Sequence, residues 1–313
     1  MAYDILGDQV YQLSGDNQVR PVGRSGQGPG EYWGVNGIAV SGESDVAIRS
    51  MDGRMIVLSS DGRLKSEWRF STSLMHDRKL VFNADGTLSV LVELAPQPAP
   101  FRSGTLGVVR LDQRGTVLDT LGPFETPWDG EEAATLPNQP RKHVEWSPAG
   151  VAVAAVSSRG QLVLSPALGR GDTVAFDVEE VGYSPEEMRA WSAHAEWLRG
   201  RVGASASIPV PPPTKPAFLR IIPSRTGEFW VQLPTASGDV APHWSPTRGG
   251  APAVPEFLAP LRFLVLDSQG RWVADLVGPA GYEPVGASGD TLWAYRRGAL
   301  GVFSVVRLVA EGG

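Results

Sequence analysis

Short runs of apolar residues alternate with turn residues along most of the chain. Between positions 37 and 70, four such runs follow one another: GIAV, SDVAIRS, RMIVLSSDG and RLKSEWRF. Runs rich in Val, Leu, Ile, Phe and Trp, bounded by Gly, Asp, Asn, Ser and Pro, are typical of β-strands joined by hairpins. Asp-Gly pairs between the runs supply the positive φ that a tight turn needs. The pattern predicts an all-β chain.

The same four-strand unit recurs after position 70. Further copies begin near positions 78 and 143. A fourth copy, from 218, is interrupted between FWVQLP and LRFLVLDSQG, and a three-strand copy closes the chain from 283. Repeated four-stranded units bury one face each by packing on the next unit, as the blades of a β-propeller do. A β-sandwich is the alternative, but it would not repeat one four-strand order. We therefore expect a β-propeller of four-stranded antiparallel blades. Weaker runs near Val10–Leu13 and Val19–Val22 leave both five and six blades open.

The longest insertion, 183–216, carries a helix signal. Ser184 can cap a helix, Pro185 suits its first position, and Glu187 can reach back to the cap. Apolar residues then recur at helical spacing, at Met188, Trp191, Ala195, Leu198 and Val202. We expect one inserted α-helix near 184–202, followed by an extended Pro-rich stretch at 209–213, within a single propeller domain over 1–313.

Residues 23–40, GRSGQGPGEYWGVNGIAV, form the most distinctive stretch. The positions that carry the pattern are Gly23, Arg24, Gly26, Gly28, Pro29, Gly30, Glu31 and Tyr32. This stretch resembles the blade-junction loop of bacterial six-bladed β-propellers related to NHL-repeat proteins. The resemblance favours six blades and implies an extracytoplasmic or periplasmic protein with a binding or scaffold role. A phosphate-binding loop would need Lys and Ser or Thr at a helix start, whereas this loop leads into a predicted strand.

Composition excludes several classes of function. With 28 Lys and Arg against 34 Asp and Glu, the net charge of −6 argues against a nucleic-acid partner. The absence of Cys excludes disulfides, thiolate metal sites and a cysteine nucleophile. No apolar run has the length of a membrane span, so we expect no transmembrane segment, and the first residues lack the features of a signal peptide.

Long insertions gather on one predicted face of the propeller. They are 95–104, 125–140, 183–216 and 234–260, whereas the opposite face has tight turns only. Long loops on a rigid scaffold commonly carry function. We therefore expect a non-catalytic protein, without a cofactor, that binds a protein partner through this face. It could be an extrinsic subunit of a larger, membrane-bound assembly. The candidate partner-binding residues are Arg78, Lys79, Trp128, Arg141, Lys142, His243 and Trp244.

An enzyme is the alternative interpretation. His76, His143 and His243 could together hold a metal at the channel mouth of a hydrolase or lyase. These histidines do not show H-x-H or H-E-x-x-H spacing, so the metal interpretation has no motif to support it. Five further tryptophans fall in predicted strands and are expected in the core: Trp68, Trp146, Trp230, Trp272 and Trp293.

Overall fold

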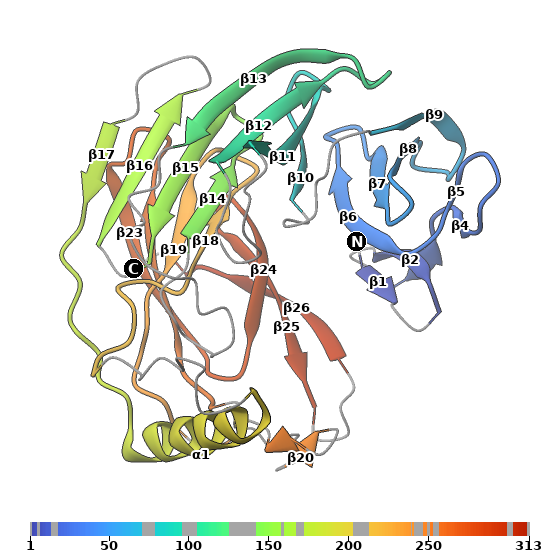
Figure 1. Cartoon of the computed structure of the whole chain (residues 1–313). Helices are drawn as coiled ribbons and strands as arrows, with labels where there is room; N and C mark the ends of the chain where they lie inside the picture. Colours follow the sequence, from blue (N-terminus) through green and yellow to red (C-terminus); the bar gives the residue numbers. More distant parts are fainter. Residues whose placement is uncertain are drawn as a thin grey trace. The chain divides into compact units, whose positions relative to one another are not determined.

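A computed structural model gives the structure of the chain (Figure 1). It describes residues 2–4, 7–13, 18–70, 79–95, 105–124, 142–157, 160–166, 172–202, 213–238, 240, 247–248, 251–252, 257–298 and 303–311. The chain forms two compact units. The first unit comprises Met1–Glu125 with Trp146–Gly150, and the second comprises Thr126–Glu145 with Val151–Gly313.

Four of the sheets contain four strands each, in the order that the repeats predict. The first of these sheets holds β6 (Val35–Val40), β7 (Val46–Ser50), β8 (Arg54–Leu58) and β9 (Leu64–Arg69). The second holds β10 (Leu80–Phe82), β11 (Leu88–Ala95), β12 (Thr105–Leu111) and β13 (Val117–Phe124). The third holds β14 (Lys142–Trp146), β15 (Val151–Val156), β16 (Gln161–Pro166) and β17 (Asp172–Ala175). The fourth holds β18 (Arg220–Pro223), β19 (Phe229–Gln232), β22 (Leu261–Leu266) and β23 (Trp272–Gly278).

The chain ends in a fifth sheet of three strands, β24 (Glu283–Ser288), β25 (Thr291–Arg297) and β26 (Phe303–Val309). These five sheets are antiparallel blades of a β-propeller, which confirms the predicted fold class. A separate three-stranded sheet precedes them and holds β1 (Ala2–Asp4), β2 (Gln9–Leu13) and β3 (Val19–Pro21). Two short pairs complete the described strands, namely β4 (Arg24–Ser25) with β5 (Glu31–Tyr32) and β20 (Thr247–Arg248) with β21 (Ala251–Pro252).

One turn geometry closes many of the hairpins. Between β10 and β11, Gly86 donates its N–H to the carbonyl of Asn83 at 3.0 Å, and Asn83 donates its own N–H to Thr87 at 2.8 Å. Gly86 has a φ of 79°, which an L-residue rarely adopts. The same pair of hydrogen bonds recurs at the turns that end in Gly62, Gly115, Gly227 and Gly270. The glycines that punctuate the sequence are therefore required by the tight turns.

The glycine-rich loop of residues 23–32 joins β3 to β6 through a buried tyrosine. Tyr32 is fully buried, and its hydroxyl accepts a hydrogen bond from the N–H of Val10 at 2.9 Å and donates one to the carbonyl of Val22 at 2.9 Å. These bonds tie the loop to β2, the middle strand of the N-terminal sheet, and to the residue that follows β3. The loop leads into strands, so it does not have the loop-to-helix geometry of a phosphate-binding loop.

Arg54 holds the same loop from the β8 side. Its buried guanidinium donates to Asp52 at 2.6 Å and Glu67 at 3.2 Å, and to the carbonyls of Gly28 at 2.9 Å and Gly26 at 3.2 Å. The planar fork of arginine can reach all four acceptors, which the single ammonium of lysine could not do in the same geometry. The loop thus has a structural role here, at the first blade.

The tryptophans of the strands divide into two groups. Trp146 and Trp230 are buried, and Trp68 packs against the core of the first two blades. The expectation was wrong for Trp272 and Trp293, whose exposed fractions are 69% and 42%. Trp272 begins β23, the outermost strand of its sheet, where side chains alternate between exposed and half-buried positions. Side chains project from the two faces of a sheet, so a strand residue is buried only where another element packs on its face.

The predicted helix is present as α1 (Pro185–Val202). Ser184 accepts a hydrogen bond from the Glu187 N–H at 3.1 Å, and the Glu187 carboxylate accepts one from the Ser184 N–H at 2.8 Å. This reciprocal cap is the one expected from the sequence. Trp191 and Ala195 are buried, as their spacing predicts. Within the described ranges, no helix is both long enough and apolar enough to cross a membrane.

Candidate functional site

Most residues proposed from the sequence as a partner surface lie outside the described part of the chain. This applies to His76, Arg78, Trp128, Arg141, His243 and Trp244. Lys79 is described and half-buried, and Lys142 is the first residue of β14. His143, also in β14, is buried with its ring 5.2 Å from that of Phe218. These residues are not brought together into a described site, and their role in binding remains a prediction.

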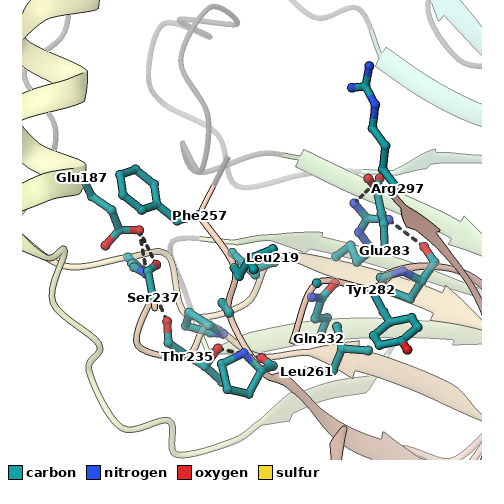
Figure 2. A pocket seen from close by; sticks show the side chains of 18 of the residues that line it. Glu187, Leu219, Gln232, Thr235, Ser237, Phe257, Leu261, Tyr282, Glu283 and Arg297 are labelled. Atoms are coloured by element: carbon teal, nitrogen blue, oxygen red, sulfur yellow. Dashed lines mark hydrogen bonds and ion pairs between the residues drawn. The ribbon is translucent and has the colours of Figure 1, made fainter. Parts of the chain in front are cut away.

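The structure shows a different site within the second unit, a cavity of about 370 Å³. Its walls come from the start of α1, from β18, β19, β24 and β25, and from the connections that carry the insertions. Because β19 and β22 are antiparallel, the connection between them leaves at the end opposite the tight turns of this blade. Figure 2 shows Glu187, Ser237 and Thr235 at one end of the cavity, and Tyr282, Glu283 and Arg297 at the other.

The first end is closed by a buried ion pair. Glu187 Oε1 and Lys215 Nζ are 2.9 Å apart, and both side chains are at most 5% exposed. Lys215 also donates to Ser237 Oγ at 2.7 Å and to the Thr235 carbonyl at 3.0 Å, and Ser237 donates to Glu187 at 2.6 Å. A buried charge pair is tolerated where its remaining hydrogen-bonding capacity is also satisfied, as it is here. The cluster joins α1 to the start of the other long insertion.

Burial and polar contacts act in opposite directions on the pKa of Glu187. Burial favours the neutral carboxyl, but hydrogen bonds from Ser237 and Ser184 and the ion pair with Lys215 outweigh it, and together they lower the pKa below its usual value. Burial, together with the charge of Glu187, raises the pKa of Tyr183 to about 12. Around neutral pH the Glu187 carboxyl is therefore ionised and the Tyr183 phenol is neutral.

At the other end, a second charged pair lies on the cavity wall. Arg220 donates to Glu283 at 3.2 Å and to the Pro284 carbonyl at 2.8 Å, and the Tyr295 hydroxyl donates to the other oxygen of Glu283. Arg220 and Glu283 are each more than a third exposed. Because water screens this pair, it adds little stability, but it fixes β18 against β24 at the cavity wall.

Two arginines at the end of β25 lie over aromatic rings. The guanidinium of Arg296 is 5.6 Å from the centre of the Tyr282 ring, and that of Arg297 is 5.3 Å from the centre of the Phe303 ring. Both arginines are exposed. A guanidinium above an aromatic face is oriented by the ring while its N–H donors remain available. The open end of the cavity is therefore positively charged.

The described residues give no metal site. Within these ranges, no group of three or more His, Asp or Glu side chains lies close enough to hold an ion. Two of the three histidines named from the sequence lie outside the ranges, and His143 packs against Phe218. The residues described here provide no observation that favours the metal-dependent alternative.

The sequence predicts the insertions but not the cavity between them. The lining residues come from separate segments around 183–191, 215–237, 257–261, 281–284 and 295–303. Of the lining residues, Glu187 was singled out by its capping motif and Trp191 by its helical spacing. Both patterns predicted a helix and not a binding site. A usable signal was the gathering of Tyr282, Tyr295 and Phe303 with Arg296 and Arg297 at strand ends on the elaborated side.

Comparison with protein-family models gives no match, and no curated protein matches the sequence. Solved structures do match the fold. A DUF4221 family member from Bacteroides vulgatus superposes with a TM-score of 0.54 at 12% identity, covering 97% of this chain and 87% of that one. This likeness supports the β-propeller fold and nothing finer.

Other solved structures are similar at lower TM-scores. A Bacteroides fragilis protein named as exported has a TM-score of 0.47 at 12% identity, covering 94% of this chain and 75% of its own. A virginiamycin B lyase from Staphylococcus aureus has a TM-score of 0.41 at 12% identity, covering 96% and 85%. A fold does not specify a function, so the function is argued from the site.

Proposed function

We propose that this protein is a non-catalytic β-propeller that binds a protein partner through the side carrying its insertions. The observation that carries the proposal is the cavity of the second unit, which the two longest insertions and the ends of blades four and five enclose together. Its closed end is held by a fully hydrogen-bonded charge cluster, and its open end presents cations and aromatic rings. Aromatic and arginine side chains are the types most often found at the energetic centre of protein interfaces.

The proposal includes two finer statements. The N-terminal sheet of β1–β3 would serve as the sixth blade of the NHL-related propellers that the glycine loop resembles. The protein would act outside the cytoplasm, as an extrinsic subunit of a larger assembly that could be membrane-bound. The loop resemblance supports both statements.

The proposal is tested by photo-crosslinking of the full chain in an extract from its native source. A crosslinking amino acid replaces Glu196, an exposed residue of α1, in one variant. In a matched control it replaces Gln269, which is exposed in the tight turn between β22 and β23 of the same unit. We expect a discrete crosslinked protein from the Glu196 position only. Crosslinks from Gln269 alone, or from neither position, would contradict the proposal.

A further inference from the structure

The charges that line the cavity do not cancel. Its charged lining residues are Glu187, Lys215, Arg220, Glu283 and Arg297. The first four form two ion pairs, one buried and one half-exposed. Among the described residues, Arg297 has no acidic partner within salt-bridge distance, and neither does its neighbour Arg296. The segment 298–302 that follows is Gly-Ala-Leu-Gly-Val, which brings no side-chain charge.

Two further polar groups of the lining are available to a ligand. No hydrogen bond is formed, within the described part of the chain, by the side-chain amide of Gln232 or by the hydroxyl of Tyr282. Both side chains line the cavity and are only half-buried. The cavity thus combines a cation with an amide and a phenol that can donate hydrogen bonds, and these are the partners that a carboxylate needs.

The rest of the wall fits an apolar side chain. Phe257, Tyr282, Tyr295 and Phe303 contribute aromatic surface, and Leu219 and Leu261 contribute aliphatic surface. Figure 2 shows Leu219, Leu261 and Gln232 in the middle of the cavity, between the Glu187 end and the end with Tyr282 and Arg297. A volume of about 370 Å³ lies at the small end of the range for ligand sites, so it suits a short stretch of peptide.

We infer that this cavity binds a peptide segment that carries a carboxylate next to an apolar side chain, with Arg297 pairing with the carboxylate. This inference rests on the proposed function, because it names the chemistry of the partner segment. The guanidinium is held over Phe303, and its N–H donors have no hydrogen-bond partner among the described residues, which suits a two-pronged pairing with a carboxylate. On a chain of net charge −6, such a localised positive mouth attracts an anionic group that the rest of the surface repels.

The carboxylate can come from an acidic side chain or from the end of a peptide chain, and a panel of probes separates these sources. The first pair is acetyl-Gly-Gly-Phe with a free carboxyl terminus and its amide. The second pair is acetyl-Gly-Glu-Phe-Gly amide and its neutral twin with Gln for Glu. Each is titrated by calorimetry into the purified full chain. We expect at least one charged peptide to bind about tenfold or more tightly than its neutral twin.

Variants assign this preference to the proposed residue. Arg297→Gln is expected to abolish the difference between the charged and neutral twins, and Arg297→Lys to retain part of it. Arg307→Gln, which changes an exposed arginine of β26 that bonds Thr291, is the matched control and should keep the full difference. Because Arg297 is exposed, its substitution should leave the melting temperature unchanged, which a thermal scan verifies.

Several results would overturn the inference. These are equal binding of charged and neutral twins, no binding of any peptide up to about 1 mM, or an unchanged preference in Arg297→Gln. Equally tight binding of N-acetylphenylalanine alone would reassign the site to a small acid.

Failure of the inference can be told apart from failure of the proposed function. If the peptides do not bind while the Glu196 position still crosslinks to a partner, the ligand assignment falls and the proposed function stands. If the peptides bind but no partner crosslinks, the ligand assignment stands and the proposed binding of a protein partner through this side falls.

Discussion

At the scale of single residues, the most consequential side chain is Lys215. It pairs with Glu187, donates to Ser237 and to the Thr235 carbonyl, and lies 5.8 Å from the centre of the Tyr183 ring. Its partner Glu187 also caps the helix, so one carboxylate performs two tasks. The placement of the helix therefore depends on a few polar contacts as well as on apolar packing.

We predict that Lys215→Met lowers the free energy of unfolding by about 3–5 kcal/mol, because it leaves the buried Glu187 carboxylate without its counter-charge. The double variant Lys215→Met with Glu187→Gln should recover most of this loss, since glutamine is neutral: its carbonyl oxygen can accept the hydrogen bond from the Ser184 N–H while its NH2 group donates to the Ser237 hydroxyl. Urea unfolding at neutral pH measures both. A double variant as unstable as the single one would show that the cost lies in lost packing.

The lowered pKa of Glu187 predicts a pH dependence of stability. A carboxyl whose folded pKa lies below its unfolded value of about 4.5 stabilises the fold above that value, and the contribution is lost as the pH falls through the folded pKa. Wild type should therefore lose stability relative to Lys215→Met with Glu187→Gln as the pH falls below about 4.5. Urea unfolding of both proteins between neutral and acidic pH gives the contribution of the Glu187 carboxyl to the free energy of unfolding, because both proteins contain all the other carboxyl groups. A constant difference would contradict the assignment.

At the scale of elements, the glycine loop shows why particular positions need glycine. Gly23 has a φ of 63°, and a Cβ there would lie 2.7 Å from Leu58 Cδ1 and 3.1 Å from the ring of Tyr32. Both neighbours are buried in the core beside β8. The loop can therefore pack against Leu58 and Tyr32 only because position 23 has no side chain.

We predict that Gly23→Ala costs about 2–4 kcal/mol of unfolding free energy, as the sum of left-handed backbone strain and the clash with Leu58. Gly42→Ala is the matched control, since nothing lies within 4 Å of a Cβ at that turn and its φ is not positive. The control should be within about 0.5 kcal/mol of wild type. Thermal or urea unfolding compares the two variants, and equal losses would refute the packing argument.

At the scale of the whole molecule, each compact unit has cores of its own. Buried clusters around Met55, Leu88 and Leu111, and around Tyr32 and Ile48, belong to the first unit. The second unit has clusters around Phe229 and around Phe263. All described residues that line the cavity belong to the second unit. The proposed binding site can therefore be tested separately from the stability of the first unit.

We predict that Gly23→Ala, although destabilising, leaves binding of the charged peptide unchanged at a temperature where the variant is folded. Lys215→Met should weaken the same binding several-fold, because it loosens the closed end of the cavity. Calorimetric titration of the two variants side by side makes the comparison. Loss of binding in Gly23→Ala would mean that the site depends on residues of the first unit.

The sequence by itself determined the repeated strands, their order, the interrupted fourth blade, the helix cap and the positions of the tight turns. Each of these follows from local rules. A glycine in a turn, a serine that caps a helix and the alternation of apolar and polar residues in a strand depend on residues that are only a few positions away in the sequence. Local rules were insufficient for Trp272 and Trp293, since the exposure of a strand residue depends on whether another element covers its face.

Only the tertiary structure decided that five distant segments meet at one cavity. Lys215 and Glu187 are both ordinary charged residues in the sequence, and their pairing depends on where the insertion returns to the blade. The same holds for Arg297, because the absence of an acidic partner among the described residues depends on how the surrounding elements pack. Non-local contacts of this kind have no period or motif, because they are fixed by the packing of whole elements against one another.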